Sequence, residues 1–125
     1  MFEITGSGFI PPTTTIIRGN DDNISVFADN TIGYTIIIGN GSNDFVSALD
    51  SRFDKITLGD GNNDAVNADR RFDDIITLGN GDGDAVRAPD NTYDRITLGN
   101  GDHDAVNADR SFDDDILTLA TAPMT

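Results

Sequence analysis

Aspartate recurs every twenty residues along the centre of the chain, each time shortly after glycine and two residues before valine. The members of this column are Asp44, Asp64, Asp84 and Asp104. Carboxylates and the backbone carbonyls of glycine-rich turns are hard oxygen ligands, and Ca²⁺ takes roughly six to eight of them at ~2.3–2.6 Å. The residue types and their spacing therefore predict a cation-binding turn in each repeat.

The elements that position these aspartates follow from the repeat itself. Glycine also recurs every twenty residues, at Gly19, Gly39, Gly59, Gly79 and Gly99. Segments such as "KITLG" and "DAVNA" alternate apolar and polar residues, which predicts short, half-buried strands. A helix over "DAVNADRRFDDII" fits the spacing of some apolar residues, but the regular glycines and β-branched residues favour strands.

Two strands and two turns in twenty residues cannot bury their apolar face alone, whereas stacked copies bury a continuous core. We therefore expect an all-β fold: a single-stack, β-roll-like β-solenoid of about five 20-residue coils, with two short parallel strands per coil. The coils span residues 19–119, and at ~4.8 Å per coil their core extends about 24 Å. Residues 1–18 are expected to form an N-terminal cap or interaction segment, and residues 120–125 a C-terminal tail.

The composition limits the partners. The 125 residues include 22 Asp and Glu against 8 Lys and Arg, a formal net charge of −14, which disfavours nucleic acid and anionic membranes. No apolar run approaches the ~18 residues needed to span a bilayer, so membrane insertion is not expected. The chain has no cysteine, which excludes disulfides and thiolate metal sites. Its first residues lack the basic start and apolar stretch of a secretory signal peptide.

A second turn in each repeat carries its own aspartate column, made up of Asp54, Asp74, Asp94 and Asp114. We expect a solvated acidic edge here, neutralised in part by Arg52, Arg70, Arg71 and Arg110, although metal binding at this turn stays open. The aromatic residues near this turn are expected to fill the wider end of the interior; they are Phe72, Tyr93 and Phe112.

The first aspartate column lies within the segments "GSNDFVS", "GNNDAVN", "GDGDAVR" and "GDHDAVN". Between residues 39 and 107 these segments resemble the calcium-binding nonapeptide repeats of RTX proteins, which follow G-G-x-G-x-D-x-U-x with U a large apolar residue. The Asp-x-Val element matches well, whereas the second glycine falls one position early. Asp, Asn or Ser stands where the family has its next glycine, and Asp and Asn tolerate the left-handed backbone.

The resemblance implies a ladder of calcium ions between successive turns, held by backbone carbonyls and aspartate side chains. Besides the four aspartates of the first column, the implied site residues are Asp60, Asp82, Asp102, Asn40, Asn80, Asn100, Gly59, Gly61, Gly79, Gly81, Gly99 and Gly101. The first repeat has Ile24 in place of the aspartate and is expected to act as a cap. The resemblance also implies an extracellular or cell-surface location, reached by type I secretion.

Elementary electrostatics supports a counter-ion without the resemblance. The first-column aspartates share the strand parity of the buried valines, so their carboxylates should point inward. Like charges ~4.8 Å apart repel by about 1 kcal/mol in water and by about 3 kcal/mol at an effective dielectric of 20. A column of inward carboxylates therefore needs a counter-charge such as calcium. An unliganded ladder of polar turns is the alternative.

We therefore expect a calcium-binding extracellular β-solenoid with a structural or adhesive role. One alternative is a self-assembling filament or matrix solenoid without calcium, because the ends of an uncapped stack invite end-to-end pairing into a homo-oligomer. Outward threonines, Thr57, Thr77 and Thr97, make ice binding a minor alternative, although Lys55 and Arg95 interrupt that face. No enzyme is expected, because His103 is the only histidine and occupies a variable turn position.

Overall fold

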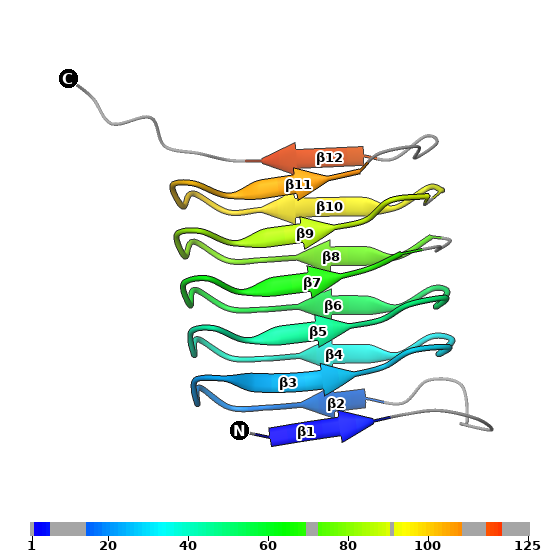
Figure 1. Cartoon of the computed structure of the whole chain (residues 1–125), viewed down its shortest axis with the longest axis horizontal. Coiled ribbons are helices and arrows are strands. Elements are labelled where there is room, and N and C mark those ends of the chain that lie inside the picture. Colours follow the sequence, from blue (N-terminus) through cyan, green and yellow to red (C-terminus); the bar gives the residue numbers. More distant parts are fainter. Residues whose placement is uncertain (1, 6–14, 70–72, 91, 109–114, 119–125) are drawn as a thin grey trace.

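The computed structural model describes all residues except 1, 6–14, 70–72, 91, 109–114 and 119–125. The described residues form strands and turns, and the strands build two six-stranded sheets in which all pairs are parallel. Each coil contributes one strand to each of the two sheets, so the chain winds as a β-solenoid (Figure 1). This confirms the all-β solenoid predicted from the sequence. Within the described part of the chain, no helix is long and apolar enough to cross a membrane.

The strands are short and regular. In order across the first sheet they are β1 (Phe2–Thr5), β3 (Ile24–Phe27), β5 (Phe45–Ser47), β7 (Ala65–Asn67), β9 (Ala85–Arg87) and β11 (Ala105–Asn107). The second sheet contains β2 (Thr15–Ile17), β4 (Thr35–Ile37), β6 (Lys55–Thr57), β8 (Ile75–Thr77), β10 (Arg95–Leu98) and β12 (Asp115–Thr118). Because β1 and β2 lie within residues 1–18, part of the segment expected to be a cap contributes one strand to each sheet.

The register stacks equivalent residues of successive repeats. Val46 pairs with Val66 in the first sheet and Ile56 with Ile76 in the second, a shift of one repeat in each case. None of these four side chains is more than 2% exposed. Burying an aliphatic side chain of this size stabilises a fold by about 1.5–3 kcal/mol relative to exposure. The repeated apolar columns are therefore the core.

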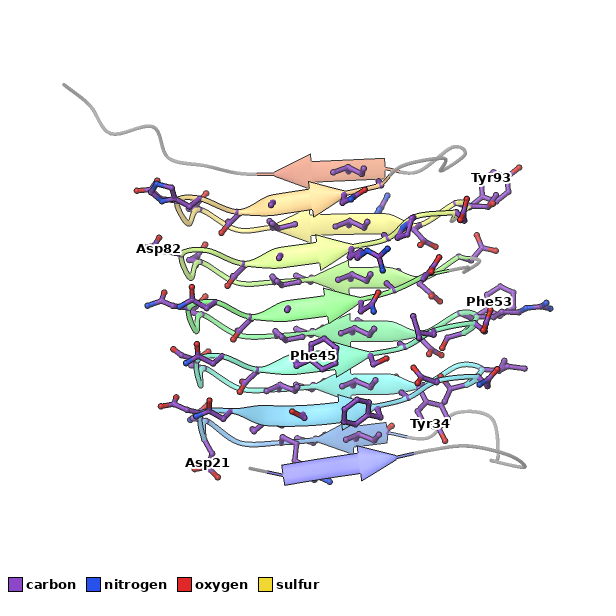
Figure 2. All side chains as sticks on the ribbon, viewed as in Figure 1. Asp21, Tyr34, Phe45, Phe53, Asp82 and Tyr93 are labelled. Atoms are coloured by element: carbon purple, nitrogen blue, oxygen red, sulfur yellow. The ribbon has the colours of Figure 1, made fainter. Side chains whose placement is uncertain are left out.

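Tyr93, one of the aromatic residues of the second turn, does not lie where the sequence led us to expect. Tyr93 is 56% exposed and points away from the stack (Figure 2), and Phe72 and Phe112 fall outside the described residues. Tyr93 has φ of 62°, so its backbone is left-handed rather than extended and strand alternation does not carry through it. Asp94, next to Tyr93, takes the inward position and is 1% exposed. The prediction for Tyr93 was therefore wrong. Tyr34, which precedes Asp54 in the same column, is buried at this edge.

Candidate metal centre

The turn that leads into each of the strands β3, β5, β7, β9 and β11 is rich in glycine, and we call it the glycine turn. Its copies are residues 19–24, 39–44, 59–64, 79–84 and 99–104. Its last residue is an aspartate in every copy but the first, and we call these residues, Asp44, Asp64, Asp84 and Asp104, the inner carboxylate column. The first three are at most 1% exposed, and Asp104 is half-buried. The inward orientation expected from strand parity is thus observed.

One oxygen of each inner carboxylate ties two coils together. Oδ1 of Asp64 accepts a hydrogen bond of 3.0 Å from the backbone amide of Asp44, and Oδ1 of Asp84 accepts one of 2.9 Å from the amide of Asp64. The ladder begins at the amide of Ile24, which donates to Asp44 over 2.8 Å, and it continues to Asp104. Ile24 therefore ends the column as a donor without adding a carboxylate.

The second oxygen of each inner carboxylate has no such partner. Oδ2 of Asp44, Asp64, Asp84 and Asp104 is buried and makes no hydrogen bond to any described residue. A buried polar atom without a hydrogen bond costs about 1–3 kcal/mol, and more when it is charged. Four copies of the same unmet acceptor in one column call for a proton or an external ligand.

Glycine backbone lies beside this second oxygen at Asp64 and Asp104. A Cβ built on Gly61 would lie 3.1 Å from Oδ2 of Asp64 and would overlap the carbonyl oxygen of Gly41 in the preceding coil. A Cβ on Gly101 would lie 3.2 Å from Oδ2 of Asp104 and would overlap the carbonyl of Gly81. Glycine is required here because the coils approach too closely for a side chain, and its backbone lies beside Oδ2.

The residue before each inner carboxylate has a left-handed backbone. Asn43, Asn63, Gly83 and His103, each one residue before an inner aspartate, have φ of 63°, 60°, 77° and 67°. Asn and Gly are the residues that adopt this conformation most readily. The resemblance had placed residues that tolerate this conformation one position earlier, at Asn62 and its equivalents, but Asn62 is not left-handed. The structure gives His103 a backbone role at an exposed turn.

Burial raises the pKa of three of the inner carboxylates. The pKa of Asp64 is raised to about 6 from 3.8, mainly by desolvation and also by the charges of Asp44 and Asp84, against the lowering effect of the hydrogen bond from the amide of Asp44. Burial likewise raises the pKa of Asp44 and of Asp84. At neutral pH a fully ionised column is therefore costly unless a cation neutralises it.

The other side chains implied as ligands lie on the outside of the glycine turn. Asn40, Asp60, Asn80, Asn100, Asp82 and Asp102 are all exposed, and Asp82 points away from the stack (Figure 2). Several of them build ladders of their own. The amide of Asp60 donates to Oδ1 of Asn40, and that of Asn80 to Oδ1 of Asp60, both over 2.9 Å. The structure thus separates a buried set of carboxylates from an exposed set.

The glycines named as site residues fall into two columns. Gly59, Gly79 and Gly99 each donate a backbone hydrogen bond of 3.0–3.1 Å to the glycine carbonyl one coil earlier. Gly61, Gly81 and Gly101 are buried beside the inner carboxylates. The second column therefore places backbone next to Oδ2, whereas the first column closes the turn.

The second turn (residues 29–34, 49–54, 69–74 and 89–94) contradicts the expectation of a solvated acidic edge. Asp54, Asp74 and Asp94 are at most 1% exposed, while Asp114 lies outside the described residues. Oδ1 of Asp54 accepts from the amide of Tyr34 over 2.8 Å, and Oδ1 of Asp74 accepts from the amide of Asp54 over 2.6 Å. Arg52 is exposed, and Arg70, Arg71 and Arg110 lie outside the described residues.

At Asp54 the second turn supplies a protein partner that the glycine turn lacks, whereas Oδ2 of Asp74 and Oδ2 of Asp94 are buried without a hydrogen bond to any described residue, as in the inner carboxylate column. The Thr31 hydroxyl lies 2.6 Å from Oδ2 of Asp54, and the hydroxyls of Thr31 and Ser51 lie 3.2 Å apart. Thr31 and Ser51, both buried, occupy the place that Gly41 and Gly61 hold in the glycine turn. Oδ2 of Asp54 therefore has a hydrogen-bond partner within the protein, whereas Oδ2 of Asp44 has none among the described residues.

The oxygen atoms that the glycine turn offers are of the type that calcium binds. The turn offers a buried carboxylate oxygen without a hydrogen bond in each coil, next to glycine backbone. No three acidic or histidine side chains among the described residues converge on one point. A bound calcium ion would therefore draw most of its ligands from backbone carbonyls and water, which its flexible coordination permits.

Comparison of the chain with known protein families, with curated proteins and with solved structures finds no match. The fold and the site thus rest on the geometry of this chain.

Proposed function

We propose that the protein is a calcium-binding structural β-solenoid whose ions bind along the inner carboxylate column. Asp44, Asp64, Asp84 and Asp104 would each offer Oδ2, and backbone carbonyls of the glycine turn would complete the coordination. A bound calcium ion would supply positive charge to Oδ2 atoms that accept no hydrogen bond from any described residue.

The unsatisfied Oδ2 atoms are the observation that carries this proposal. Four stacked carboxylates share the same unmet acceptor, and glycine rather than a hydroxyl residue stands beside it. The Thr31–Asp54 pair of the second turn is the internal comparison, because the Thr31 hydroxyl donates to the corresponding oxygen of Asp54. At that copy a threonine hydroxyl satisfies the carboxylate without an external ligand.

Calcium binding in this position would couple to folding. The carboxylates that would hold the ions also accept amide hydrogen bonds from the preceding coil, so ligand and stack would support each other. Such coupling suits a rod with a structural or adhesive role in a calcium-rich extracellular setting. That location, like assembly of rods end to end, stays a prediction.

Circular dichroism with thermal unfolding, in millimolar calcium and after EGTA treatment at neutral pH, tests the proposal. We expect calcium to raise the melting temperature, by an amount that grows with calcium concentration. Asp64→Asn should reduce that rise, whereas Asp54→Asn, a matched change at the turn with the Thr31 partner, should leave most of it. An identical melting temperature with and without calcium would contradict the proposed calcium site.

A further inference from the structure

The exposed side of the glycine turn carries an Asn-Gly step in three coils, at Asn40, Asn80 and Asn100. In such a step the glycine amide nitrogen can attack Cγ of the asparagine, because glycine has no side chain to hinder ring closure. Ammonia leaves and a cyclic succinimide forms, which water then opens to aspartate or isoaspartate. Asn40 and Asn80 are both exposed, so the same reactive step occurs twice at equivalent places of the stack.

Two hydrogen bonds fix the orientation of the Asn80 carboxamide. Its Oδ1 accepts from the backbone amide of Asn100 over 3.0 Å, and its Nδ2 donates to Oδ1 of Asp60 over 3.2 Å. A flipped carboxamide would set donor against donor and acceptor against acceptor. The carbonyl oxygen of Asn80 therefore faces an N–H group, and the nitrogen that would leave as ammonia faces a carboxylate.

Both contacts favour the loss of ammonia. When the Gly81 nitrogen attacks Cγ of Asn80, negative charge develops on Oδ1, where the Asn100 amide stabilises it as an oxyanion-hole donor does. The reaction moves one proton from the Gly81 nitrogen to Nδ2, and Asp60 is within hydrogen-bond distance of Nδ2 to relay it. The Gly81 amide donates no hydrogen bond to any described residue, so none among them has to break before it reacts.

Asn40 is a matched Asn-Gly step without the carboxylate. Its Oδ1 accepts from the backbone amide of Asp60 over 2.9 Å, so the donor to the carbonyl oxygen is present. One coil earlier in the same column stands Asn20, whose Oδ1 accepts from the amide of Asn40 over 2.8 Å. A carboxamide does not take up a proton near neutral pH, as a carboxylate can. The two steps thus differ in the group available to relay the proton.

The fold accepts aspartate, the product of the reaction, in this column. Oδ1 of Asp60 accepts from the amide of Asn80 over 2.9 Å, just as Oδ1 of Asn40 accepts from the amide of Asp60. An aspartate at position 80 would keep the hydrogen bond from Asn100 in the same way. It would also add a negative charge beside Asp60, which would strengthen cation binding at this turn if the proposed calcium function holds.

From the amide donor, the neighbouring carboxylate and the accepted product, we infer that Asn80 is a site of intramolecular deamidation, with Asp60 as its proton relay. The atoms balance: the Gly81 nitrogen bonds to Cγ, the bond from Cγ to Nδ2 breaks, ammonia leaves, and water opens the ring. The reaction itself does not require calcium.

Incubation of the full chain at about pH 7.5 in EGTA, followed by peptide mapping with mass spectrometry, tests the inference. Succinimide, aspartate and isoaspartate should together accumulate at least about threefold faster at Asn80 than at Asn40. The chain unfolded in urea is the control, because the two Asn-Gly steps should react at similar rates once the Asp60 contact is lost.

The variant Asp60→Asn removes the carboxylate and keeps an oxygen for the amide of Asn80, so circular dichroism should show a folded stack. In this variant the rate at Asn80 should fall to that at Asn40, and peptide mapping separates the new Asn-Gly step at position 60. Equal rates at Asn40 and Asn80 in the folded wild type would overturn the inference, as would an unchanged rate at Asn80 in the variant. Because EGTA is present throughout, failure of the calcium proposal would leave these expected rates unchanged.

Discussion

The backbone amide of Asp64 donates a hydrogen bond to Oδ1 of Asp84 in the next coil, 2.9 Å away, while Oδ2 of Asp84 stays buried without a hydrogen bond to any described residue. The two oxygens of one carboxylate therefore differ in what they do. One holds successive coils in register, and the other requires a proton or a cation. Any ligand of the second oxygen acts on the same group that holds the stack together.

The stability of the cation-free protein should depend on pH in an unusual direction. Burial raises the pKa of Asp64 to about 6 from 3.8, so the native state binds this proton more tightly than the unfolded chain. The resulting stabilisation is fully present below the unfolded pKa, near 4, and is lost as pH rises through the folded pKa, near 6. Urea unfolding in EGTA should thus give a larger free energy of unfolding at about pH 5 than at about pH 7.5.

The matched variant for this pH series is Asp64→Asn, which removes the titrating group and keeps an oxygen for the amide of Asp44. Its free energy of unfolding should vary less with pH than that of the wild type. Equal pH profiles for the two proteins would show that Asp64 does not titrate as described.

Substitution of a buried carboxylate should lower the calcium affinity more than substitution of an exposed one. Asp64→Asn should weaken binding at its turn by at least about tenfold, because a buried anionic ligand is lost. Asp82→Asn should change the affinity much less, because Asp82 is exposed and its Oδ1 already accepts from the amide of Asp102 over 2.9 Å. Isothermal titration calorimetry measures both. A larger loss for Asp82→Asn would place the ions on the outside of the turn.

The close stacking of glycine turns should make Gly81 intolerant of any side chain. A Cβ on Gly81 would overlap the carbonyl oxygen of Gly61, so Gly81→Ala should destabilise the protein by about 1–3 kcal/mol or more. Gly19→Ala is the control, because no atom lies within 4 Å of its Cβ position, and its effect should stay within about 0.5 kcal/mol. Denaturant unfolding compares them, and similar losses would contradict the described stacking.

The solenoid could be predicted from the sequence because the repeat has a constant length of twenty residues. A twenty-residue shift pairs Val46 with Val66, so alternating apolar residues could be assigned to the interior without further information. The same parity was available for the second turn, where Asp74 precedes buried Ile76 as Asp64 precedes buried Val66. Applying it there would have predicted the burial that the structure reveals.

The turns were less predictable because their backbone is not extended. Left-handed residues at Asn63 and Tyr93 reverse the local direction of the chain, and no alternation rule carries through them. The hydrogen bond from Thr31 to Asp54 depends on that turn geometry, as does the outward position of Tyr93. Whether a carboxylate oxygen meets a hydroxyl or only glycine backbone is therefore decided by the folded turn.

The most direct measurement of the central claim is a crystal structure of the protein grown in saturating calcium at about pH 7.5, with anomalous diffraction to locate the ions. Calcium–oxygen distances should be ~2.3–2.6 Å. We predict anomalous peaks at this distance from Oδ2 of Asp64 and Asp84. Anomalous maps without peaks beside these oxygens, or with peaks only beside the exposed Asp82 and Asp102, would contradict the proposed calcium site.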